Sequence, residues 1–123
     1  MPRVLVVDDQ ADVRTIISIV LRIHHFEIIE AESAASALKL FEEASFGEAS
    51  FDLAIVDIGL PKLDGYEVAR RVRQQIPASE LRLVALTGYG QDSDHELVMR
   101  AGFDTHLVKP LNHARLEKIL AGF

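Results

Sequence analysis

Val4-Leu5-Val6-Val7-Asp8-Asp9 is the stretch that decides the fold, because an unbroken apolar and β-branched run leads directly into two aspartates. A strand that is apolar at every position is buried on both faces, as in a parallel sheet covered by helices on both sides. Similar runs occur at Ala54-Ile55-Val56, Leu83-Val84-Ala85-Leu86 and Leu107-Val108. The mixed polarity of residues 26–30 predicts an edge strand.

The segments between these runs carry apolar residues at helical spacing, one stripe in each segment. Asn112 is a candidate N-cap, residues 93–96 form a possible capping box, and Gly102 is a candidate helix stop. The predicted pattern is five strand–helix units in strict alternation, a doubly wound α/β fold with a surface loop at residues 45–50. The stripes are Val13, Ile16, Ile17, Val20 and Leu21; Ala34, Ala37, Leu38 and Phe41; Val68, Ala69, Val72 and Ile76; Leu97, Val98 and Ala101; and Leu116, Ile119, Leu120 and Phe123.

Length and composition restrict the class of protein. The 123 residues fit one domain, spanning residues 1–123. The absence of cysteine excludes a disulfide scaffold and a thiolate metal site, and it suits a cytoplasmic location. The net charge of -6 gives no basic footprint for nucleic acid. We also expect no membrane span, which needs roughly 20 apolar residues, and no signal peptide.

Reactive side chains follow four of the five predicted strands. Asp8 and Asp9 end the first strand, Asp57 the third, Thr87 the fourth and Lys109 the fifth. Ligands in doubly wound folds bind outside the carboxyl ends of the strands, so these groups should meet at one edge of the sheet. Each residue alone would be an ordinary turn former or helix cap, but that explanation does not account for all four strand ends together.

Three converging carboxylates repel one another unless a cation offsets their charge. Oxygen ligands without cysteine or paired histidine favour Mg²⁺, with Mn²⁺ as an alternative, over zinc. A carboxylate can act as a nucleophile and form an aspartyl phosphate. The cation and Lys109 would then neutralise charge on the transferred group, and Thr87 could hydrogen-bond to it.

The motifs at the strand ends resemble those of response regulator receiver domains, the phosphoacceptor modules of two-component signalling. The matching segments cover Val4 to Pro110 and are highly specific when taken together. They are Val-Leu-Val-Val-Asp8-Asp9, Val56-Asp57-Ile58-Gly59-Leu60-Pro61, Asp64-Gly65-Tyr66-Glu67, Leu86-Thr87-Gly88 and Leu107-Val108-Lys109-Pro110. The resemblance implies a flavodoxin-like (βα)5 fold with strand order 2-1-3-4-5.

The resemblance also implies roles for individual residues. Asp57 would be the phosphoacceptor. Asp9 and Asp57 would bind Mg²⁺ directly, with Asp8 contributing partly through water and with the backbone carbonyl of Gly59 as a further ligand. The phosphoryl group would come from a histidine kinase or a histidine phosphotransfer protein, and its transfer would switch partner binding.

On the phosphoryl side of this implied site, Thr87 and Lys109 would contact the transferred group, and the Lys109–Pro110 peptide bond would be cis. Thr87 would also be part of the switch. Many receivers carry tyrosine or phenylalanine at the position of His106, so this residue implies either a modified switch or simply a partly exposed histidine on an edge strand. Gly59 and Tyr89 occupy positions that modulate dephosphorylation across the family.

Other functions stay open at this point. An aspartate-dependent phosphatase would usually carry a second acid at the position of Gly59, and a nucleotide or flavin binder would carry a phosphate-binding loop where residues 8–12 are acidic. A degenerate receiver could serve only as a docking module. We expect a signalling domain that catalyses its own phosphorylation and slow dephosphorylation, either alone or attached to an output domain. The wording of residues 57–61 and 106–110 leans mildly toward the receivers of hybrid histidine kinases.

Overall fold

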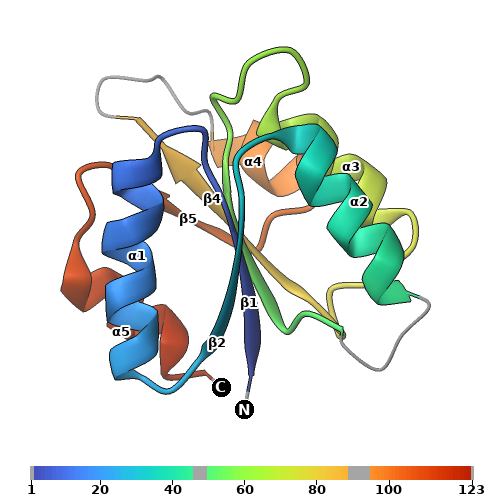
Figure 1. Ribbon diagram of the computed structural model, residues 1–123. Helices are drawn as coiled ribbons and strands as arrows, with labels where there is room; N and C mark the ends of the chain where they lie inside the picture. Colours follow the sequence, from blue (N-terminus) through green and yellow to red (C-terminus); the bar gives the residue numbers. More distant parts are fainter. Residues whose placement is uncertain (1, 46–49, 89–94, 123) are drawn as a thin grey trace.

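Five parallel strands form one sheet in the order β2-β1-β3-β4-β5, as predicted. The computed structural model describes residues 2–45, 50–88 and 95–122 (Figure 1). Strands and helices alternate along the chain without exception in this part. The strands are β1 (Arg3–Val7), β2 (Glu27–Ala31), β3 (Leu53–Asp57), β4 (Arg82–Thr87) and β5 (Thr105–Val108). The helices are α1 (Ala11–Ile23), α2 (Ala34–Ser45), α3 (Gly65–Arg73), α4 (His95–Ala101) and α5 (His113–Leu120).

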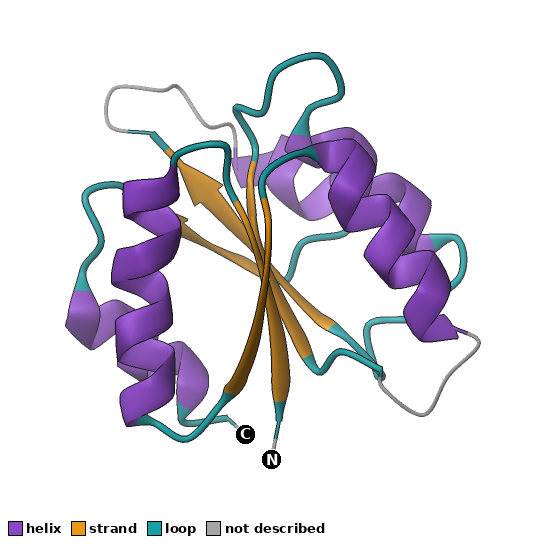
Figure 2. Ribbon diagram, viewed as in Figure 1, coloured by secondary structure: helices purple, strands orange, loops and turns teal. Residues whose placement is uncertain are grey.

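Helices cover both faces of the sheet (Figure 2). Helices α1 and α5 lie on one face, and α2, α3 and α4 lie on the other (Figure 1). Successive strand residues point to opposite faces, so Val4 and Val6 pack in the cluster with α1 and α5, whereas Leu5 and Val7 pack in the cluster with α2, α3 and α4. The continuous apolar run of β1 therefore supplies two cores.

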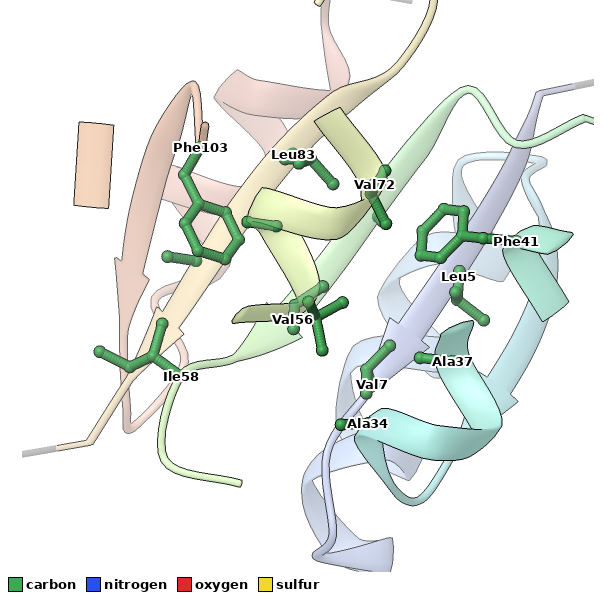
Figure 3. Packing of buried hydrophobic residues seen from close by; sticks show 14 of the residues in the cluster. Leu5, Val7, Ala34, Ala37, Phe41, Val56, Ile58, Val72, Leu83 and Phe103 are labelled. Carbon is green, nitrogen blue, oxygen red and sulfur yellow. The ribbon is translucent and has the colours of Figure 1, made fainter. Parts of the chain in front are cut away.

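The core under α2, α3 and α4 joins residues from distant parts of the sequence. Phe41 of α2, Val72 of α3 and Phe103 beyond α4 belong to one buried cluster with Leu5 and Val56 of the sheet (Figure 3). Each of these side chains is at most 4% exposed. Burying an aliphatic or aromatic side chain contributes about 1.5–3 kcal/mol, so this packing holds the strand ends in place.

The sequence predicted two helix ends correctly, the N-cap of α5 and the C-terminal stop of α4. The Asn112 side chain accepts a hydrogen bond from the Arg115 amide at 3.1 Å and caps α5. Gly102 has a φ of 114°, and the amide of Phe103 donates to the Val98 carbonyl, so α4 stops there. The predicted capping box begins at Ser93, which lies outside the described residues, as does Phe123.

Three residues of the predicted stripes do not lie where we expected. Ile16 is 48% exposed and Leu97 is 45% exposed, and Ile76 follows the end of α3. Adjacent helix positions point about 100° apart, because an α-helix has 3.6 residues per turn. Hence Ile17 and Val98 take the buried positions and their preceding neighbours face outward.

The predicted loop at residues 45–50 is partly corrected, because Ser45 still belongs to α2, and residues 46–49 lie outside the described part of the chain. Within the described residues, no helix has the length and apolar character needed to cross a membrane.

Candidate functional site

The sheet register brings the four reactive strand ends together. Asp57 ends β3 and pairs with Leu86 of β4, next to Thr87. Thr87 in turn pairs with Val108 of β5, the residue before Lys109. Strand β1 pairs with β3 on the side away from β4, and Asp8 directly follows Val7, the last residue of β1. All these groups lie at the carboxyl edge of the sheet, opposite the two chain termini (Figure 1).

Three carboxylates converge at this edge. Asp8, Asp9 and Asp57 each place one carboxylate oxygen within 4.8 Å of the others. Asp8 is 0% exposed and Asp57 is 5% exposed, whereas Asp9 faces solvent. The backbone amide of Gly59 donates to Asp57 Oδ1 at 2.9 Å. The structure thus confirms the predicted convergence of these three carboxylates.

Lys109 bridges the two buried acids. Its Nζ lies 2.8 Å from Asp8 Oδ2 and 3.4 Å from Asp57 Oδ2. Burial lowers the pKa of Lys109, but the hydrogen bond to Asp8 and the charges of Asp57 and Asp8 outweigh it, so the pKa is raised. The Lys109 amide donates to the Thr87 carbonyl at 2.7 Å, and the Lys109–Pro110 peptide bond is cis.

The charge balance of the cluster suits a divalent cation. Burial raises the pKa of Asp8, although its hydrogen bonds with Lys109 and with the Gln10 amide lower it in part. One ammonium faces three carboxylates, so two negative charges are unbalanced when all three acids are ionised. The donors are all oxygens, and one acid is exposed, which fits Mg²⁺ or Mn²⁺ with retained water ligands.

Thr87 and His106 lie on the neighbouring strands β4 and β5. Thr87 is 1% exposed, and its hydroxyl donates to the Leu107 carbonyl at 3.3 Å. His106 is half-buried on the edge strand β5 and pairs in register with Ala85. Tyr89, which the resemblance implied as a modulating residue, lies outside the described residues.

Gly65 supports the site in a way that its sequence motif did not reveal. A Cβ atom on Gly65 would lie 2.4 Å from the Asp57 carbonyl oxygen and 2.7 Å from the Ile58 Cα atom. Both are backbone atoms, so only glycine permits α3 to begin this close to the end of β3. The preceding Asp64 caps α3 by accepting from the Glu67 amide at 3.0 Å. The Asp64-Gly65-Tyr66-Glu67 motif marked this position, but the sequence did not show how close α3 lies to the end of β3.

The sequence matches one protein family over nearly its whole length. The model of the family described as "Response regulator receiver domain" matches residues 4–121. This chain belongs to the response regulator receiver domain family. The receiver domain is a module of two-component signalling, and its site lies where the sheet register gathers the strand ends.

Curated relatives agree with this assignment. The receiver domain is 31% identical over 117 residues to an uncharacterized 14.6 kDa protein of Leptolyngbya boryana, covering 95% of this chain and 86% of that protein. It is 33% identical over 115 residues to the probable transcriptional regulator ycf27 of Porphyra purpurea, covering 94% of this chain but 44% of the regulator. The chain thus spans less than half of ycf27.

Solved structures share the fold of this receiver domain. A receiver domain protein from Clostridium thermocellum superposes with a TM-score of 0.86 at 28% identity, covering 99% of this chain and 93% of that one. The chemotaxis protein CheY4 of Vibrio cholerae gives 0.85 at 29% identity, covering 99% and 98%. The Ssk1 receiver domain of Saccharomyces cerevisiae, crystallised with the histidine phosphotransfer protein Ypd1, gives 0.82 at 25% identity, covering 98% and 86%.

Proposed function

We propose that this receiver domain, residues 1–123, accepts a phosphoryl group onto Asp57 from a phosphohistidine of a partner protein, with Mg²⁺ bound alongside. The observation that carries the proposal is the convergence of three carboxylates with Lys109 at one sheet edge. Asp8, Asp9, Asp57 and the Gly59 carbonyl would hold Mg²⁺, and Mn²⁺ has the same oxygen preference.

The proposed transfer is a single displacement at phosphorus. A carboxylate oxygen of Asp57 attacks, a new O–P bond forms, and the N–P bond to the partner's imidazole breaks, with its electron pair going to the departing nitrogen. Lys109 already contacts Asp57, so its ammonium is placed to bind a phosphoryl oxygen. The cation, when bound, supplies positive charge against the phosphoryl oxygens. Slow attack of water on phosphorus would return Asp57 and release inorganic phosphate.

Thr87 and His106 are the residues that we assign to the switch. The Thr87 hydroxyl now bonds to the Leu107 carbonyl. Rebonding of this hydroxyl to a phosphoryl oxygen would break that link between β4 and β5, and partner binding would read the change. Gly59 has no side chain to shield the phosphoryl group, and we assign Gly59 and Tyr89 to the control of its lifetime.

The partner that we propose is a histidine kinase or a histidine phosphotransfer protein in the cytoplasm. The similarity to the Ssk1 receiver, which was crystallised with a histidine phosphotransfer protein, supports this assignment. The greater length of the ycf27 regulators makes an output domain attached to this module part of the proposal. The acidic net charge of -6 supports no nucleic-acid binding by the receiver itself, and we assign it no membrane contact.

Intact-protein mass spectrometry after incubation with acetyl phosphate and Mg²⁺ tests the proposed transfer. We expect one added phosphoryl group on the wild type and none on Asp57→Asn. Asp52→Asn is the matched control, because Asp52 precedes the same strand at the opposite edge, where its carboxylate accepts from the Arg3 amide at 2.8 Å. This control should be modified like the wild type.

Other outcomes would contradict the proposal in different ways. An unmodified wild type, under conditions that modify another receiver, would indicate a docking module. Equal modification of Asp57→Asn would place the acceptor elsewhere. Turnover of small phosphate esters would favour an aspartate-dependent phosphatase.

A further inference from the structure

Arg14 is a cation in the first turn of α1, where the helix dipole disfavours positive charge. Its side chain is only 16% exposed and turns back toward the sheet. The guanidinium donates to the Asp8 backbone carbonyl at 2.6 Å and to Glu30 Oε1 of β2 at 3.2 Å. These contacts offset the unfavourable position and connect α1, β2 and the turn that carries the acids.

The Asp8 carbonyl and the Asp9 amide belong to one planar peptide unit. A donor that binds this carbonyl therefore fixes the orientation of the peptide plane that leads into Asp9. The other end of Asp8 is also tied to β2, because its amide donates to the Ala31 carbonyl at 3.1 Å. Arg14 completes the attachment of this turn to β2.

A hydrogen bond from the Gln10 amide to Asp8 Oδ1 at 2.9 Å also restrains the turn around Asp9, but it does not hold the Asp8 carbonyl. Helix α1 begins after Gln10, whose side chain makes no capping hydrogen bond. Asp9 itself is exposed, so packing does not hold its carboxylate. Among the residues that the structure describes, Arg14 forms its ion pair with Glu30 and not with an acid of the site. Its contact with the site runs through the backbone.

We propose that Arg14, held by Glu30, is a positioning residue that fixes the Asp8–Asp9 peptide plane and so aims the Asp9 carboxylate at the cation site. The inference rests on the proposed function. Arginine suits the role because its planar fork can donate to the carbonyl and to Glu30 at once, whereas lysine offers a compact ammonium. Loss of such support around a metal site commonly weakens metal binding about 10–100-fold.

Charge and positioning make opposite predictions for Arg14→Met. Removal of a nearby positive charge alone would tighten Mg²⁺ binding, whereas loss of the support for Asp9 would weaken it. Arg14→Lys separates the two effects further, since it keeps the charge and loses the double contact. If positioning dominates, both variants bind Mg²⁺ more weakly than the wild type.

The experiment is a titration of each full-length variant with Mg²⁺ alone, followed by the amide NMR signals of Asp9 and Gln10. We expect the dissociation constant to rise at least about tenfold for Arg14→Met, and by a smaller factor for Arg14→Lys and Glu30→Gln. Phosphorylation by acetyl phosphate should be slow at low Mg²⁺ and recover at saturating Mg²⁺. Rescue by the cation is a result that a merely structural role would not produce.

A matched control pair lies at the starts of β1 and β2, at the opposite edge of the sheet. Arg3 and Glu27 form an ion pair of 3.5 Å between β1 and β2, far from the acids. Arg3→Met and Glu27→Gln should leave Mg²⁺ affinity unchanged. Glu30→Gln retains Arg14 and tests the inference if Arg14→Met fails to fold.

Unchanged or tighter Mg²⁺ binding in folded Arg14→Met or Glu30→Gln would overturn the inference, as would equal weakening by the Glu27→Gln control. If the wild type neither binds Mg²⁺ nor accepts a phosphoryl group, the proposed function fails and the role of Arg14 fails with it. If the wild type does both and the Arg14 and Glu30 variants match it, only the role of Arg14 is refuted.

Discussion

The carboxyl edge of the sheet, where the strands end, and the amino edge, where they begin, carry the same kinds of charged side chain but balance their charges differently. At the amino edge, Arg73 donates to Asp104 at 2.9 Å and to the carbonyls of Leu81 and Gly102 at 2.6 and 2.8 Å. Asp104 also accepts from the Leu83 amide at 2.8 Å. Both charges meet an opposite charge and backbone groups, so the arrangement fastens α3 to the starts of β4 and β5.

At the carboxyl edge, Lys109 is shared by Asp8 and Asp57, and Asp9 adds a third acid. Burial raises the pKa of Asp8, so ionising this group works against folding in the absence of a cation. The excess negative charge at this edge would favour binding of a positively charged ligand. The comparison indicates that the amino edge serves stability, whereas the carboxyl edge carries unbalanced charge at a cost in stability, as the proposed cation site requires.

Substitution of the glycines at the two edges should give the largest contrast in phosphoryl acceptance. Gly65→Ala forces a Cβ against the Asp57 and Ile58 backbone, and overpacking of this kind costs about 1–3 kcal/mol. Gly122→Ala meets the tip of the Arg82 side chain at 2.8 Å, which can move aside. We expect Gly65→Ala to lose stability in urea unfolding and most phosphoryl acceptance by mass spectrometry, whereas Gly122→Ala stays within about 0.5 kcal/mol of the wild type.

Equal behaviour of the two glycine variants would contradict the close approach of α3 to the site. A fully active Gly65→Ala protein would show that the end of β3 can move without harm to Asp57.

Arg73→Met should separate stability from function. The substitution removes the donor to three backbone carbonyls and one of two donors to Asp104, and we expect a loss of about 1–3 kcal/mol in the free energy of unfolding. Phosphoryl acceptance by the folded variant should equal that of the wild type, because Arg73 lies at the amino edge. Urea unfolding and mass spectrometry at a temperature where the variant is folded check both parts. A defect in acceptance at full folding would refute the division between the edges.

Asp8→Asn should change the free energy of unfolding of the metal-free protein by less than Arg73→Met does, and should raise it instead of lowering it. A raised pKa means that the native state holds the proton more tightly than the unfolded chain, so the contribution of Asp8 is full below pH 3.8 and is lost as pH rises through the folded pKa. We therefore expect Asp8→Asn to be more stable than the wild type near neutral pH in EDTA, and the difference to shrink toward pH 3.8.

Urea unfolding from acidic to neutral pH measures this difference. Added Mg²⁺ should stabilise the wild type more than Asp8→Asn, which lacks one acid of the cluster. A less stable Asp8→Asn at neutral pH in EDTA would show that the ion pair with Lys109 outweighs the burial of Asp8.

Much of this fold could be predicted from the sequence because four of its five strands carry a continuous apolar run. The run from Val4 to Val7 has one interpretation, a strand buried on both faces, and the acids after it follow from the rule on strand ends. Asn112 and Gly102 are local signals whose meaning depends on a few neighbouring residues. The buried face of a helix was harder to predict, because Ile16 and Leu97 are apolar like core residues but lie one position from the buried stripe.

The long-range contacts at the two edges could not be predicted in the same way. Arg14 reaches Glu30 across 16 positions, and Arg73 reaches Asp104 across 31, so both contacts depend on the folded distance between elements. The closeness of Gly65 to the Asp57 carbonyl depends on where α3 begins relative to β3. Sequence patterns identify the groups that react, whereas three-dimensional packing decides which groups hold them.

Paramagnetic broadening of backbone amide NMR signals by Mn²⁺ tests the division between the edges most directly. We predict that low Mn²⁺ concentrations broaden the amides of Gln10 and Gly59, which donate to the two buried acids, and that excess Mg²⁺ restores them. The amides of Glu27 and Asp104 at the amino edge should keep their intensity. Broadening centred on the amino edge, or spread evenly over the molecule, would contradict a cation site formed by Asp8, Asp9 and Asp57.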